Sequence, residues 1–161
     1  MSMIGNFLRV SEEELEAYLK DSSLLEDRIY NEEDEEDPNL RDIDKAWDGI
    51  IYILTGNGIQ GADLSDFEGL HAVVFSGQLI DPEQDLGYGP AHYLMPEQVK
   101  KFSEELAKKT WENLYQNYKP GDMNEKGVYP VIWDDQGEAF TYPYSYFDNL
   151  RDFYAEAAKN N

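Results

Sequence analysis

The sequence contains no cysteine, which excludes disulfide bonds and thiolate metal sites and fits a reducing compartment. It also lacks any run approaching the roughly 18 consecutive apolar residues that span a bilayer. Residues 1–10 show no basic segment followed by an apolar one, so the sequence predicts no secretory leader. We therefore expect a soluble, cytoplasmic protein with no membrane association.

Positive charge is scarce in this chain. It has 13 Lys and Arg against 34 Asp and Glu, which gives a net charge of −21. Residues 46–99 contain no Lys or Arg. Such an excess of negative charge repels phosphate groups, so we expect no nucleic-acid partner. A basic protein is the partner that this charge favours.

One unbroken acidic run comprises Glu32, Glu33, Asp34, Glu35, Glu36 and Asp37. Six adjacent like charges predict a solvated surface loop at about 31–39. The alternative hypothesis is that the run is an acidic docking segment for the basic partner.

Residues suited to metal binding or nucleophilic catalysis are few. The two histidines, His71 and His92, lie in neither H-x-x-x-H nor H-E-x-x-H spacing, so we expect no metal site and no cofactor. No G-x-S-x-G motif is present, and Ser76 has only these distant histidines as candidate bases. We favour a non-catalytic function, although a chain this rich in carboxylates always offers some close pair for acid and base chemistry.

Residues 56–61 form a literal G-x-G-x-x-G motif. A dinucleotide site needs this motif between a strand and a helix. Here the preceding apolar residues, from Ile43 through Trp47 and Ile50 to Leu54, keep helical spacing. The glycines therefore indicate the exit of a helix rather than a phosphate-binding turn.

The remaining patterns predict a single α+β domain over residues 1–161, with a small mixed sheet packed against several amphipathic helices. Aromatic residues make up 14% of the chain and supply an ample core. Ser11 and Glu14 have the spacing of a capping box, and Val10 and Leu15 that of a hydrophobic staple. Strands are predicted at 4–10, 72–75 and 128–133, a turn at 119–122, and helices beginning at 11, 23, 43, 96 and 145.

Residues 86–94 contain two glycines, a proline and three ring-bearing side chains, Tyr88, His92 and Tyr93. The glycines and the proline indicate a sharp turn ahead of the helix at Pro96. The tyrosines either pack into the core as a rigid corner or form the wall of a pocket.

Five segments of the chain, at 3–10, 42–49, 54–56, 86–91 and 129–134, resemble the YfbM-like family of small bacterial proteins. The resemblance runs in order from residue 3 to about residue 158. It implies an α+β domain of unknown function and supplies no catalytic residue. The chain departs from the family pattern at Asp48, where a histidine is frequent, and at His92, where an arginine is frequent.

Three functional hypotheses follow from these observations. The first is a non-catalytic protein whose acidic surface engages a basic protein partner. The alternatives are a small-ligand binder with an aromatic pocket and a carboxylate-based hydrolase or transferase. The candidate residues for binding a ligand or partner are Trp47, Asp48, Tyr88, His92, Tyr93, Tyr129 and Trp133.

The net charge generates a first prediction. Sodium or potassium chloride should raise the melting temperature between low salt and about 0.5 M, because chloride salts screen repulsion among carboxylates without the strong surface exclusion of sulfate. Thermal unfolding followed by circular dichroism checks this. A flat or falling melting temperature would mean that the charges are already dispersed or paired.

Overall fold

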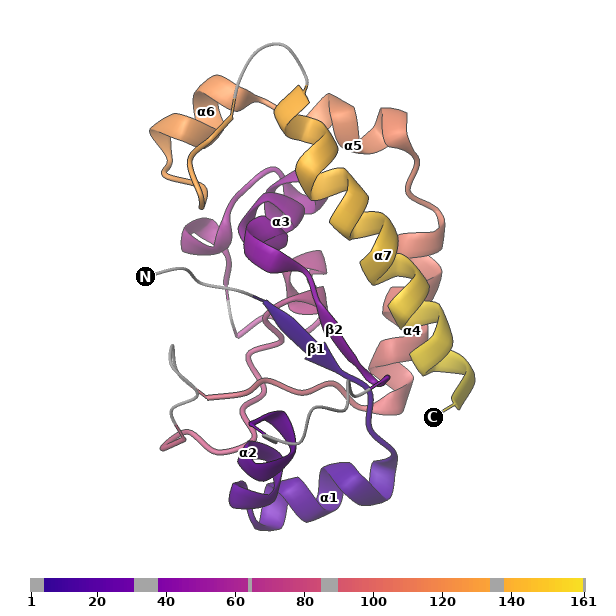
Figure 1. Cartoon of the computed structure of the whole chain (residues 1–161). Helices are drawn as coiled ribbons and strands as arrows, with labels where there is room; N and C mark the ends of the chain where they lie inside the picture. The colour runs from indigo at the N-terminus through magenta and orange to yellow at the C-terminus, as the bar shows by residue number, and fades with distance from the viewer. Residues whose placement is uncertain (1–4, 31–37, 64, 85–89, 134–137, 161) are drawn as a thin grey trace.

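The computed structural model describes residues 5–30, 38–63, 65–84, 90–133 and 138–160, which fold into a short β-ribbon surrounded by helices (Figure 1). None of the described helices is both long enough and apolar enough to cross a membrane. The elements in chain order are β1 (Asn6–Leu8), α1 (Glu12–Lys20), α2 (Ser23–Ile29), β2 (Leu40–Asp42), the 3₁₀ turn η1 (Asp44–Ala46), α3 (Trp47–Thr55), η2 (Ile59–Gly61), η3 (Leu70–Val73), α4 (Pro96–Ala107), α5 (Trp111–Asn117), α6 (Pro120–Glu125) and α7 (Glu138–Asn160).

The sheet consists of β1 and β2, paired antiparallel with Phe7 opposite Arg41 and Leu8 opposite Leu40. The predicted α+β class is confirmed. Within the described residues the sheet has these two antiparallel strands, where a small mixed sheet was expected. A two-stranded ribbon is only marginally stable alone, so its position depends on the helices packed against it.

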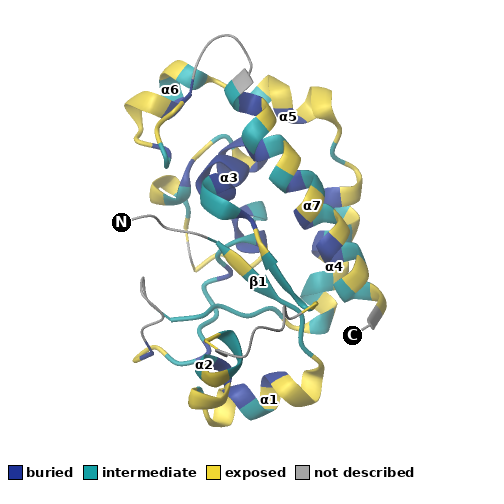
Figure 2. Cartoon of the chain, in the orientation of Figure 1, coloured by how far each residue is buried: buried dark blue, intermediate teal, exposed yellow. Residues whose placement is uncertain are grey.

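Helix α3 lies at the centre of the main hydrophobic core. Its eight residues from Trp47 to Leu54 are all buried, as the dark colour of α3 in Figure 2 shows. Helices α5 and α7 pack on it, and α4 packs along α7 (Figure 1). Gly56 ends α3 in the left-handed conformation with φ of 84°, as the sequence predicts.

A second, smaller hydrophobic cluster forms around α1 and α2, with Leu15, Tyr18, Leu25 and Ile80 buried in it. The predicted capping box at the start of α1 is confirmed. The Ser11 hydroxyl accepts the Glu14 N–H at 3.1 Å, and the Glu14 carboxylate accepts the Ser11 N–H at 3.0 Å. Ser23 and Glu26 have the same spacing but make no box, because Ser23 is already inside α2 and its hydroxyl donates to Asp21 at 2.5 Å.

Two of the predicted strands are wrong. Residues 72–75 belong to the 3₁₀ turn η3 and its exit, and Ala72 and Val73 are buried residues of this turn. Residues 128–133 form an irregular segment in which Val131 has a φ of 64°, outside the β region. Both are short apolar runs, whose periodicity alone does not separate a strand from a buried turn.

Two helices also differ from prediction. The expected turn at 119–122 is the first part of α6, with Pro120 in the first helical turn. The last helix begins at Glu138, seven residues before the predicted start, and carries Pro143 inside it. The buried Pro143 packs near Gly49 of α3, so tertiary contact compensates for the poor helix propensity of proline.

Packing around α3 generates a matched pair of glycine substitutions. Gly49→Ala would place a methyl group 2.8 Å from the Trp133 ring and should lower the free energy of unfolding by about 1–3 kcal/mol. Gly121→Ala in α6, where nothing lies within 4 Å, should be neutral or stabilising by up to about 1 kcal/mol. Urea denaturation measures both. Equal effects of the two variants would contradict the close packing of Trp133 on α3.

Candidate functional site

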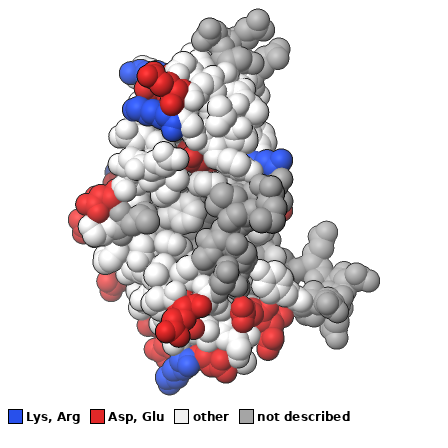
Figure 3. Space-filling model, turned by 90° about the vertical axis from the view of Figure 1, so that its left-hand side faces the viewer, with Lys and Arg blue, Asp and Glu red and all other residues white. Residues whose placement is uncertain are grey.

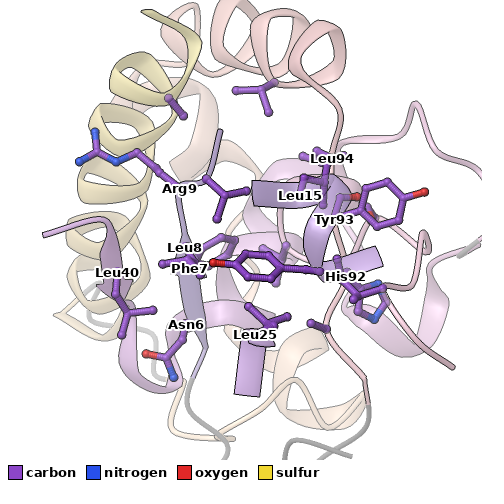
Figure 4. Close-up of a pocket in the computed structure, with 18 of the residues that line it drawn as sticks. Asn6, Phe7, Leu8, Arg9, Leu15, Leu25, Leu40, His92, Tyr93 and Leu94 are labelled. Atoms are coloured by element: carbon purple, nitrogen blue, oxygen red, sulfur yellow. The ribbon is translucent and has the colours of Figure 1, made fainter. Parts of the chain in front are cut away.

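A cavity of ≈480 Å³ lies between the two hydrophobic clusters. The ribbon, α1, α2 and α7 contribute to its wall, together with the segments at 72–76 and 90–94 (Figure 4). Its size falls within the roughly 300–1,000 Å³ of small-molecule sites. Apolar side chains that line it include Phe7, Leu8, Leu15, Leu25, Phe75 and Leu94.

Charge is almost absent from this lining. Among the described residues that form it, only Arg9 and Glu12 carry a formal charge at neutral pH. Figure 4 shows the guanidinium of Arg9 reaching toward α7, away from Leu15 and Leu25. The described lining is therefore mainly apolar, with Arg9 as its one cation and Glu12 as its one anion.

Aromatic rings connect the cavity wall to the main core. The Trp47 ring stacks on Tyr129 at 5.5 Å between centroids, with 22° between the planes. Trp47 also meets Phe75 edge-on at 5.5 Å between centroids, and Phe75 in turn meets His92 at 5.2 Å. These rings come from elements far apart in the sequence. Their contacts with one another give the cavity wall a fixed shape.

His92 acts as a neutral hydrogen-bonding group. Its Nδ1 accepts the backbone N–H of Gly77 at 3.0 Å, and burial lowers its pKa. The proton of the neutral ring is therefore on Nε2. His92 lies beside Tyr93 in the cavity lining, and neither supplies a positive charge at neutral pH.

The carboxylate of Asp48 joins two loops to the start of α3. One oxygen accepts the Ile59 N–H at 2.7 Å, and the other accepts the Tyr129 N–H at 2.9 Å. Burial raises the pKa of Asp48, and this effect outweighs the two hydrogen bonds, which act to lower it. Asp48 lies outside the cavity lining and orients Tyr129 behind Trp47.

The glycine motif at 56–61 takes part in the same arrangement. Gly56 ends α3, and the chain then enters η2, so the motif follows a helix as predicted. A β-carbon at Gly58 would lie 3.0 Å from the Asp48 carboxylate. The close approach of backbone to carboxylate accounts for glycine at this position.

The other candidate residues lie elsewhere. Trp133 is buried against α3 and donates its indole N–H to the Val128 carbonyl at 2.8 Å, away from the cavity. Tyr88 and the acidic run at 32–37 lie outside the described residues. Of the candidate set, the structure brings together Trp47, His92 and Tyr93 in the lining.

Sequence reasoning missed most of the apolar lining. Leu8, Leu15 and Leu25 come from three elements, and each looks like an ordinary core residue in its own helix or strand. One sequence feature could have pointed to the cavity, namely that Arg9 stands among apolar neighbours in residues 7–10. Their meeting around one cavity depends on contacts between distant segments.

Comparison with known proteins identifies relatives without an established activity. The family model of DUF1877, a domain of unknown function, matches residues 1–161. A crystal structure of YfbM from Escherichia coli, a protein of unknown function, superposes with a TM-score of 0.71 over 98% of this chain and 94% of that chain, at 20% sequence identity. No curated protein matches the chain. The resemblance expected from the sequence is confirmed, and the structural likeness concerns the fold alone.

The environment of Asp48 generates a prediction about stability. Asp48→Asn should lower the free energy of unfolding by about 1–3 kcal/mol at neutral pH, because an amide has one acceptor oxygen and leaves one buried N–H without a partner. Asp152→Asn, at an exposed position on α7, is the control and should change stability little. Urea denaturation of the two variants measures the difference.

The same variant has a defined pH dependence. Because burial raises the Asp48 pKa above its unfolded value, the stability that Asp48 contributes is greatest below the unfolded pKa and declines as pH rises through the folded pKa. The advantage of the wild type over Asp48→Asn should therefore shrink as the pH rises above the unfolded pKa of about 4. An advantage that grows as the pH rises would mean that the hydrogen bonds, and not burial, dominate the pKa.

Proposed function

The chain belongs to the DUF1877 family, a family of unknown function, and from that premise we propose that it binds a small, mainly apolar molecule in the cavity between its two hydrophobic clusters. The observation that carries this proposal is the ≈480 Å³ apolar cavity. Water in such a space gains few hydrogen bonds, so an apolar ligand is favoured by roughly 25 cal/mol for each Å² of apolar surface removed from water.

Binding without catalysis fits the polar groups around the cavity. Ser76 donates its hydroxyl hydrogen bond to the Tyr93 carbonyl at 2.7 Å, so it is held away from the role of nucleophile. Glu12 is the single carboxylate among the described lining residues, so the wall offers no carboxylate pair for acid and base chemistry. The polar groups that remain suit recognition of a ligand.

A second candidate function is docking of a basic protein, favoured by the surface of α1. Glu12, Glu13 and Glu16 are exposed on this helix, and Figure 3 shows acidic side chains gathered at the end of the molecule where α1 and α2 lie. With a net charge of −21, this face would attract a cationic protein surface over long range. It leaves the apolar cavity unexplained, which is why ligand binding is the primary proposal.

Two neighbouring alanines on α7 test the ligand-binding proposal. Ala157 lines the cavity and Ala158 does not, although both are half-buried. Nile red, an uncharged dye that brightens in apolar surroundings, should bind the wild type and Ala158→Phe saturably. Ala157→Phe should weaken this binding about tenfold or more, because the added ring occupies part of the cavity. Fluorescence titration gives the dissociation constants.

Melting temperatures of both variants, measured alongside the titrations, check that each remains folded. Equal dye affinity in Ala157→Phe and Ala158→Phe, or no saturable binding to the wild type, would contradict a ligand site in this cavity.

A further inference from the structure

Two arginines converge on one aromatic ring at the α7 end of the cavity. The guanidinium carbons of Arg9 and Arg41 lie 5.3 and 5.8 Å from the centroid of Phe153. Strand pairing explains their meeting, because Arg41 is opposite Phe7 and Arg9 follows Phe7 by two residues on the same face of the ribbon. Their β-carbons are diagonal neighbours, roughly 7–8 Å apart in such a ladder.

Both guanidinium groups lack a carboxylate partner among the described residues, in a chain with 34 Asp and Glu. The Arg9 Nη2 atom donates to the Pro38 carbonyl at a long 3.3 Å, and its Nε is buried without a hydrogen-bond partner. In contrast, Arg28 is paired with Glu14 at 2.6 Å, and Arg151 is paired with Asp148.

Two like charges that contact one ring, neither paired with a carboxylate among the described residues, repel each other, and an anion bound by both would offset this repulsion. A buried N–H without an acceptor adds to this cost. Arg9 and Phe153 are themselves part of the cavity lining, and Arg41 reaches this edge of the cavity through its contact with Phe153. Within the part of the chain that the structure describes, the two arginines thus have no negatively charged acceptor, and Arg9 stands at the edge of an apolar space.

We propose that Arg9 and Arg41 bind the carboxylate of an amphiphilic ligand whose apolar tail occupies the cavity. This inference rests on the proposed function and names its ligand class, a monocarboxylate with an aliphatic or aromatic body. The planar fork of a guanidinium matches the two oxygens of a carboxylate. A single negative charge is also repelled less than a phosphate dianion by a protein of net charge −21.

The geometry assigns separate parts of the ligand to separate elements. The ribbon supplies the two cations, and Phe153 of α7 makes a cation–π contact with each of them. Leu8, Leu15 and Leu25 supply the surface for the tail. Both parts are needed for tight binding, because each alone gives a weak interaction in water.

A pair of ligands that differ in the head group tests the assignment. Octanoate and octan-1-ol share one aliphatic tail, and isothermal titration calorimetry at about 0.15 M salt limits the repulsion between octanoate and the acidic surface. Octanoate should bind the wild type about tenfold more tightly than octan-1-ol. Arg9→Gln and Arg41→Gln should each remove most of this preference, weakening octanoate binding far more than octan-1-ol binding.

Arg151→Gln is the matched control, since Arg151 also lies over a phenylalanine of α7, with its guanidinium carbon 5.6 Å from the Phe147 ring, but is paired with Asp148. It removes the same charge and should keep the preference for octanoate. Equal affinities of the wild type for both ligands, or an equal loss in all three variants, would overturn the arginine assignment while leaving a neutral-ligand site intact. Failure of both ligands and of Nile red to bind would instead remove the proposed function itself.

Discussion

The structure depends on a buried carboxylate that holds two loops against its central helix. Asp48 stands at the start of α3, and its two oxygens accept the N–H groups of Ile59 and Tyr129. A carboxylate buried without such partners would cost several kcal/mol, so both loops must adopt these positions when α3 is buried. Through Tyr129 this constraint also sets the Trp47 ring, which forms part of the cavity wall. One polar contact thus connects the core to the candidate site.

The cavity exists because the chain builds two apolar clusters instead of one. The main cluster surrounds α3, and the smaller one surrounds α1 and α2. The ribbon runs between them, with Phe7 packed toward the main cluster and Leu8 toward the smaller one, as the alternation of side chains along a strand requires. The same alternation places Arg9 and Arg41 on the side of α7, and residues from both faces of the ribbon, Leu8 and Arg9 among them, line the one cavity.

Local signals in the sequence predicted several elements well. The Ser11 capping box, the apolar period that continues to Leu54 and the proline at 96 mark helices that the structure contains, because each reflects contacts within one or two turns. Residues 128–133 show where this reasoning fails. The Asn124 side chain bonds both the N–H and the carbonyl of Trp133, at 3.4 and 2.8 Å, so side-chain contacts replace the strand pairing that the apolar residues suggested.

By itself, the sequence determined the class of fold, the strong negative charge, the absence of thiol chemistry and the exit of a helix at the glycine motif. These properties follow from composition or from neighbours along the chain. Only the tertiary structure decided that Trp47, His92 and Tyr93 share a cavity with Leu15 and Leu25, and that Arg9 and Arg41 meet over one ring of α7. Such meetings are set by packing between segments up to about 140 positions apart, and contacts of that range leave no periodic trace in the sequence.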